Sequence, residues 1–207
     1  MQNDTLIVSD TGPLITLCQI DKLYILQRMF NKVYIPLAVY DELNSKDHLD
    51  EINKINNSSF IHVESVRNTD EVERILKSNK RLHIGEIEAI IMAEELGKNN
   101  KFLIVDDMCA RSYAEMRGVS TIGAIGIIAQ AIRRNYIECT EVEECITTMK
   151  SNNRFYSEDL YELLREAAKE SLIQYNIKPY FDDNKNEELL VKAFKAHVKH
   201  NTNNNGR

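Results

Sequence analysis

Two apolar stretches of this chain run directly into acidic residues. Residues 103–105 (LIV) precede Asp106 and Asp107, and residues 6–9 (LIVS) precede Asp10. Near-continuous apolar runs of this length, rich in β-branched residues, are typical of buried parallel strands. Because an open α/β sheet places its ligand site at the carboxyl ends of its strands, we expect these acids to gather at one edge of a sheet. The chain is then a scaffold for an acidic cluster.

Strand patterns and helical patterns alternate over the first 135 residues. Strands are expected at residues 5–9, 32–35, 60–63, 102–105 and 119–123. Helical patterns occupy residues 14–18, 23–30, 36–43, 71–76, 84–96, 108–117 and 125–134, with a helix and a loop within residues 44–58 and a turn at residues 10–13. Alternation at this spacing favours an α/β fold with a mostly parallel sheet.

The carboxyl-terminal part follows a different pattern. Residues 140–150 and 157–175 are expected to form two amphipathic helices, and a further helix is indicated at residues 186–198 within a charged, Asn-rich tail. We therefore divide the chain into an α/β domain over residues 1–150, a helical extension packing on it over residues 151–178, and a tail over residues 179–207 whose end is expected to be disordered.

Composition narrows the class of protein. The 207 residues are 43% hydrophobic, which is enough for a buried core. No apolar run, residues 124–132 included, approaches the roughly 18 residues of a membrane span, and no secretion signal is expected at the amino terminus.

The four cysteines form no CxxC pair, so a reducing cytoplasm is the expected compartment. The net charge of −6 argues against nonspecific adhesion to nucleic acid, but not against a nuclease with an acidic metal site.

Five acids form the candidate site: Asp10, Glu42, Glu86, Asp106 and Asp107. Brought close together, their charges would repel and raise their pKa values unless a cation lies among them. Oxygen ligands without histidine or cysteine suit Mg²⁺ or Mn²⁺. Two such ions about 3.5–4 Å apart activate a water molecule and stabilise the leaving oxygen of a phosphodiester. The cluster therefore indicates metal-dependent phosphodiester hydrolysis.

Polar and basic neighbours add to this candidate site. Ser9 and Thr11 flank Asp10, where their hydroxyl groups are able to hold its carboxylate or a water molecule. Arg111 lies four residues after Asp107, so that one helical turn brings its guanidinium near a bound phosphate.

Each acid also has a purely structural interpretation. An Asp after a strand is often a helix cap, and a Glu in the first turn of a helix is favoured by the helix dipole. Glu88 shares the first turns of its helix with Glu86, and Asp41 is expected to be solvated. Thr121 and His83 are weaker candidates for the rim of the site.

Four segments resemble, in order, the successive motifs of PIN-domain proteins: residues 8–15 (VSDTGPLI), 35–43 (IPLAVYDEL), 85–90 (GEIEAI) and 103–107 (LIVDD). The branch they resemble most is described as a predicted nucleic-acid-binding protein related to the VapC-type toxins. Residues 154–161 (RFYSEDLY) resemble the carboxyl-terminal helix of that branch, so the resemblance covers about residues 5–165. It implies a three-layer α/β/α sandwich with a carboxyl-terminal helical extension, and metal-dependent cleavage of single-stranded RNA.

By this resemblance, Asp10 corresponds to the first acid of the family, Glu42 to the second, Glu86 to the third, and the Asp106/Asp107 pair to the last. The commonest toxin pattern has Asp rather than Glu as the third acid and no doublet at the last position. Which of the two aspartates faces the metal therefore stays open.

The resemblance also implies protein partners. These are a small cognate antitoxin and a second copy of the chain. Antitoxins of this type lay an apolar helix in a groove and point a basic residue at the carboxylates; the helix indicated at residues 186–198 is an alternative cover for that groove. The expected function is an endoribonuclease, the toxin of a toxin–antitoxin pair. The alternative is a PIN-fold RNA-binding or regulatory module with little turnover.

Two other classes that gather acids at strand ends fit less well. A phosphorylation receiver normally has a lysine after its last strand, where Gly123 and Ala124 stand. A haloacid-dehalogenase-type phosphatase has a second Asp two residues after the first, where Gly12 stands.

Overall fold

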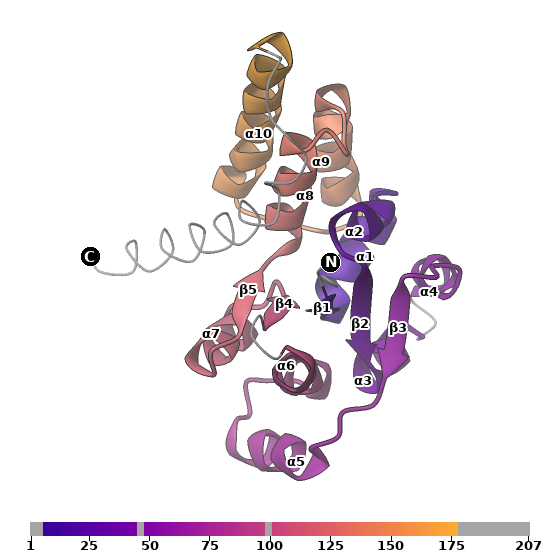
Figure 1. The fold of residues 1–207 in the computed structure, drawn as a ribbon, viewed down its shortest axis with the longest axis vertical. Helices are drawn as coiled ribbons and strands as arrows, with labels where there is room; N and C mark the ends of the chain where they lie inside the picture. Colours follow the sequence, from indigo (N-terminus) through magenta and orange to yellow (C-terminus); the bar gives the residue numbers. More distant parts are fainter. Residues whose placement is uncertain (1–5, 45–47, 98–100, 178–207) are drawn as a thin grey trace, which may run out of the picture.

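The structure, a computed structural model, describes residues 6–44, 48–97 and 101–177, and its centre is a five-stranded sheet (Figure 1). The strands are β1 (Leu6–Ser9), β2 (Lys32–Pro36), β3 (Ile61–Glu64), β4 (Phe102–Ile104) and β5 (Ser120–Ile122). Their order is β3-β2-β1-β4-β5, and each pair of neighbours is parallel. The expected parallel α/β fold is confirmed.

Helices connect the strands and continue beyond them. They are α1 (Thr11–Gln19), α2 (Tyr24–Met29), α3 (Leu37–Leu43), α4 (Leu49–Asn56), α5 (Thr69–Ser78), α6 (Ile84–Leu96), α7 (Met108–Met116), α8 (Ala124–Arg133), the 3₁₀ helix η2 (Cys139–Glu141), α9 (Val142–Ser151) and α10 (Glu158–Ile177). None of the helices in the described segments is long and apolar enough to cross a membrane.

The two faces of the sheet are covered by different helices, because successive side chains of a strand point to opposite faces. On one face, Ile7 and Ile104 pack with apolar residues of α1, α2 and α8. On the other face, Val8 and Leu103 pack with α5, α6 and α7. Figure 1 shows these layers, with α1, α2 and α8 on one side of the strands and α5, α6 and α7 on the other. The three-layer α/β/α sandwich is therefore confirmed.

The carboxyl-terminal helices extend the layer that contains α8. α10 packs against α8 and α9 and buries Tyr161, Leu164 and Ala167. The division into domains stays a prediction, and its first boundary, after residue 150, falls one residue before the end of α9. The helix indicated at residues 186–198 lies outside the described residues.

The topological switch point of the sheet lies between β1 and β4. The chain runs outward from β1 through β2 to β3, and then crosses back to place β4 on the other side of β1. Open α/β sheets bind ligands at the carboxyl ends of the strands at such a point. Ser9 pairs with Ile104 across it, and the backbone N–H of Asp10 donates to the Ile104 carbonyl at 2.9 Å. Asp10 and the residues after Ile104 therefore leave the sheet side by side.

The turn expected at residues 10–13 is wrong, because α1 begins directly at Thr11. Pro13 is the third residue of this helix. The first N–H groups of a helix have no intrahelical acceptor, so a proline is tolerated there. The early start of α1 places Thr11 and Gly12 in its first turn, next to Asp10.

Candidate active site

Asp10 and Glu42 meet at the carboxyl ends of β1 and β2. Asp10 is buried, with 8% of its surface exposed. Glu42 reaches the same place from α3, which follows β2, and is itself exposed. The Thr11 hydroxyl donates to Oε2 of Glu42 at 2.7 Å, and the Thr11 backbone N–H bonds the Asp10 carboxylate. Thr11 therefore links the first two acids.

The first turn of α6 lies close to these two carboxylates at Gly85. A methyl group on Gly85 would lie 3.5 Å from Oε2 of Glu42 and 3.9 Å from Oδ1 of Asp10. The next residue, Glu86, is also 8% exposed, and its Oε2 accepts the backbone N–H of His83 at 2.9 Å. Glu86 thus stabilises the first turn of α6, as the structural interpretation predicts, and also lies beside the other acids.

The two aspartates after β4 have different surroundings. Asp107 is exposed and caps α7, since its Oδ1 accepts the backbone N–H groups of Cys109 and Ala110, both at 2.8 Å. Asp106 is half-buried, and its Oδ1 accepts the backbone N–H of Ala124, at the start of α8, at 2.8 Å. The sequence left open which of the two aspartates faces a metal. In the structure, Asp106 faces inward and Asp107 lies on the surface.

The carboxylates lie close enough to perturb one another's ionisation. Burial, supported by the charges of Glu86, Glu42 and Asp106, raises the pKa of Asp10 from 3.8 to about 7. Burial also raises the pKa of Glu86, and the charges of Asp107 and Glu42 act in the same direction. A shared cation relieves repulsion of this kind. All five predicted acids therefore belong to one electrostatically coupled group.

The chemistry of this donor set fits a hard divalent cation. The acids offer carboxylate oxygens, which Mg²⁺ and Mn²⁺ prefer, and oxygens of Asp10 and Glu42 face the same point beside Gly85. Within residues 6–44, 48–97 and 101–177, however, no three His, Cys, Asp or Glu side chains already converge as a metal-binding group. Several of the oxygens accept hydrogen bonds from the protein.

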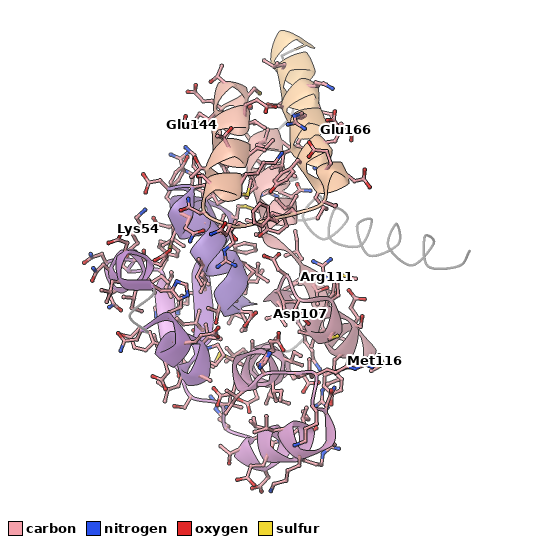
Figure 2. The ribbon with its side chains drawn as sticks, turned by 180° about the vertical axis from the view of Figure 1, so that it is seen from behind. Lys54, Asp107, Arg111, Met116, Glu144 and Glu166 are labelled. Atoms are coloured by element: carbon pink, nitrogen blue, oxygen red, sulfur yellow. The ribbon has the colours of Figure 1, made fainter. Side chains whose placement is uncertain are left out.

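Arg111 lies one helical turn after Asp107, and Figure 2 shows the two residues close together at the start of α7. Its Nη2 donates to the Val105 carbonyl at 3.3 Å, whereas its Nε is buried without a hydrogen-bond partner. A hollow of about 100 Å³ opens here, lined by Asp106, Met108, Arg111, Gly123, Ile125, Gly126, Tyr156 and Leu160. The hollow therefore combines one cationic side chain, one acid and an apolar wall.

Three further sequence candidates form hydrogen bonds with groups other than the five acid side chains. The Ser9 hydroxyl donates to the backbone carbonyl of the next residue at 3.0 Å, and not to a carboxylate. Thr121 donates to Glu115 of α7 at 2.7 Å. Glu88 accepts the backbone N–H of Ala38 at 3.1 Å and so caps the first turn of α3.

Tyr156 is a residue of the site that the sequence patterns missed. It lies between α9 and α10, and its hydroxyl donates to Oδ2 of Asp106 at 2.9 Å. Burial raises the pKa of Tyr156, which keeps its hydroxyl protonated as a donor. Burial likewise raises the pKa of Asp106, while the hydrogen bonds from Ala124 and Tyr156 oppose that rise. The sequence signal for Tyr156 is the segment 154–161, whose family resemblance carried no role for this residue.

The chain matches a protein-family model. A family model described as DUF3368, a PIN domain, matches residues 6–170, which include the five acids, Arg111 and Tyr156. The comparison with curated proteins and the comparison with solved structures each gave no match.

Proposed function

The chain belongs to the PIN-domain family, whose members are generally nucleases, and we propose that it cleaves single-stranded RNA with the help of Mg²⁺ or Mn²⁺. The observation that carries this proposal is the meeting of Asp10, Glu42, Glu86 and Asp106 at the switch point of the sheet. Four separate segments supply these acids, and burial, together with the charges of the other three acids, raises the pKa of Asp10. Such crowding is unfavourable for the apo-protein and favourable for binding a cation.

In this proposal, Asp10, Glu42, Glu86 and Asp106 hold one or two divalent ions. A bound ion lowers the pKa of the attacking water and stabilises the leaving oxygen of the phosphodiester. Asp107 gives one oxygen to the amides of α7. Asp106 is half-buried and its charge acts on Asp10, whereas Asp107 is exposed. We therefore assign the metal to Asp106 and the helix cap to Asp107, whose charge acts on Glu86.

The proposed RNA contact is Arg111. Its unpartnered Nε and the adjoining hollow suit a phosphate next to the one that is cleaved. Because the chain carries a net charge of −6, RNA binding depends on local positive charge from bound ions and Arg111.

We also propose that the protein is the toxin of a toxin–antitoxin pair, with a small antitoxin and a second copy of the chain as partners. The support for this part is the resemblance to the VapC-type branch. The alternative, an RNA-binding or regulatory module with little turnover, is favoured by one observation: in the described segments, the acids do not yet converge on a single metal position.

The test of the proposed function is cleavage of end-labelled RNA by the purified protein. We expect single-stranded RNA to be cut with Mn²⁺ or Mg²⁺ and to stay intact with EDTA, while double-stranded RNA and single-stranded DNA of the same sequence are cut more slowly. Cleavage that persists in EDTA would contradict metal dependence. Binding of RNA without cleavage under all conditions would favour the alternative.

Glu42 and Asp41 provide a matched pair for this assay, since both are exposed acids on α3. The Glu42 carboxylate lies beside Thr11 and Asp10, whereas Asp41 is the neighbouring residue on the same helix. We expect Glu42→Gln to lower kcat about 100-fold, because losing ~3 kcal/mol of charge stabilisation corresponds to that factor. Asp41→Asn should stay within about twofold of wild type. If the two variants cleaved RNA at equal rates, Glu42 would not belong to the active site.

Gly123 permits the close approach of Asp106 and Arg111. A methyl group on Gly123 would lie 2.7 Å from Oδ1 of Asp106 and 2.9 Å from Nη2 of Arg111, so at least one side chain must move. The backbone φ of Gly123 is −90°, which any residue adopts. We therefore expect Gly123→Ala to fold, and to lower kcat roughly 10- to 100-fold through misplacement of Asp106. Gly118→Ala, where a methyl group would meet no atom within 4 Å, is the control; its positive φ of 77° costs stability but no activity.

A further inference from the structure

We propose that Tyr156 is a positioning residue for Asp106, which makes the loop between α9 and α10 a part of the active site. The inference deepens the proposed nuclease function and rests on it. Tyr156 follows Asp106 by 50 residues and comes after the last strand of the sheet. The part of the chain that follows the sheet would then take part in the active site through one hydroxyl group.

The carboxylate of Asp106 is held from both sides. Its Oδ2 accepts the Tyr156 hydroxyl at 2.9 Å, and its Oδ1 accepts the backbone N–H of Ala124 at 2.8 Å. Two donors on two oxygens fix the plane of the carboxylate. Because each oxygen has two lone pairs, each retains one for a cation or a water molecule. Donors of this kind orient metal ligands, and their loss costs roughly 10- to 100-fold in metal affinity or activity.

Tyr156 is itself held by contacts that do not involve Asp106. Its ring packs edge-to-face against Tyr161 with the centroids 6.1 Å apart, and its backbone N–H donates to the Tyr161 hydroxyl at 3.2 Å. Tyr161 is buried in α10, and its hydroxyl donates to the carbonyl of Arg154 at 2.9 Å. The loop is therefore anchored to α10, and the Tyr156 hydroxyl is presented in a fixed position.

A second hydroxyl extends this chain of hydrogen bonds into α1. Oγ1 of the buried Thr16 lies 2.9 Å from the Tyr156 hydroxyl oxygen. Since Tyr156 uses its single proton for Asp106, the single Thr16 proton is shared between the Tyr156 oxygen and the Gly12 carbonyl, to which Oγ1 of Thr16 also donates at 3.2 Å. Consecutive bonds of this kind polarise and strengthen one another. These hydrogen bonds connect Thr16 of α1, Tyr156 of the α9–α10 loop and Asp106 after β4.

The experiment combines Tyr156→Phe, Asp106→Asn and the double variant, with Tyr24→Phe as a matched control. The control removes a hydroxyl that donates to the Tyr136 carbonyl at 2.8 Å on the exposed surface. Mn²⁺ affinity is measured by calorimetric titration of the full chain, and RNA cleavage gives kcat and KM. We expect Tyr156→Phe to weaken Mn²⁺ binding about tenfold and to lower kcat about tenfold with little change in KM, and Tyr24→Phe to behave as wild type.

The double variant tests whether Tyr156 acts through Asp106. In the Asp106→Asn background, Tyr156→Phe should change Mn²⁺ affinity and kcat less than about twofold. Thr16→Val, which leaves Tyr156 in place, should show a smaller loss in the same direction and replaces Tyr156→Phe if that variant fails to fold.

The outcomes separate this inference from the proposed function. If wild type cleaves RNA and binds Mn²⁺ while Tyr156→Phe does both equally well, the inference is overturned and the nuclease stands. Full additivity of the two substitutions also overturns it. If wild type binds Mn²⁺ without cleaving RNA, the nuclease proposal fails and the titrations alone decide on Tyr156. A wild type that does neither overturns both.

Discussion

Asp10→Asn is expected to lower metal-dependent RNA cleavage at least about 1,000-fold, and at the same time to raise the melting temperature of the metal-free protein at pH 8 by roughly 5 °C. Asp10 is buried, and the charges of three other acids act on it. Removing its charge therefore removes a metal ligand and a source of repulsion together. The Asn oxygen is still able to accept the Thr11 backbone N–H, so the fold is retained.

A substitution that damages a structural residue lowers both stability and activity, whereas one that removes a crowded metal ligand moves them in opposite directions. Thermal unfolding with EDTA and the RNA assay with Mn²⁺ give the two readouts. Asp70→Asn, an exposed acid in the first turn of α5, serves as the control and should change neither. An Asp10→Asn protein that is less stable than wild type and fully active would identify Asp10 as an ordinary capping residue.

The gathering of the acids followed from the sequence because it needs only the strand pattern and the rule for parallel sheets. β1 (Leu6–Ser9) and β4 (Phe102–Ile104) are neighbouring strands, so Asp10 and Asp106 leave the sheet side by side. The sequence also placed Glu86 in the first turn of a helix, but the closeness of Gly85 to the carboxylates of Asp10 and Glu42 is visible only in the structure.

The sequence patterns could not supply the orientation of side chains. Asp106 and Asp107 are chemically identical neighbours, and their directions differ because α7 begins at Met108, which makes Asp107 the cap. Glu88 has the same local pattern as Glu86, yet it caps α3, a helix distant in sequence. In both cases the deciding contact is tertiary, or depends on the exact first residue of a helix, which patterns locate only within a few residues.

Tyr156 was missed for a similar reason. Its contact with Asp106 exists because α10 packs against α8 and carries the preceding loop to the edge of the sheet. Nothing in the spacing of residues 154–161 indicates this packing. A division of the chain by strand pattern alone assigns these residues to an extension, although the Tyr156 hydroxyl contacts one of the acids.

The metal-free protein is expected to lose stability as the pH rises, by an amount on the order of 3 kcal/mol between pH 5 and pH 8. The pKa of Asp10 is about 7 in the folded protein, against 3.8 for the ordinary group. The folded state therefore binds more protons than the unfolded state between these two values, and the free energy of unfolding falls as the pH rises through that window. The raised pKa values of Glu86 and Asp106 act in the same direction.

Acids with lowered pKa values do not obscure this effect. Glu143 and Glu158, which pair with Arg165, contribute stability that is lost only when the pH falls through the acidic range below about 4.5. Between pH 5 and pH 8 they stay ionised in both states. The slope in this window therefore reports the carboxylates of the candidate site.

Mn²⁺ should cancel the loss at pH 8, because an ion that binds only the folded state at 100 times its Kd adds about 2.7 kcal/mol. At pH 5 the same ion should add much less, since its ligands must first lose their protons. The measurement is thermal unfolding at both pH values with EDTA, Mn²⁺, or NaCl of equal ionic strength, and a 3 kcal/mol change corresponds to roughly 6–12 °C. If NaCl restored the stability at pH 8 as well as Mn²⁺ does, charge screening alone would explain the effect of Mn²⁺. In Asp10→Asn both the pH slope and the Mn²⁺ rescue should shrink, because a single buried carboxylate dominates them.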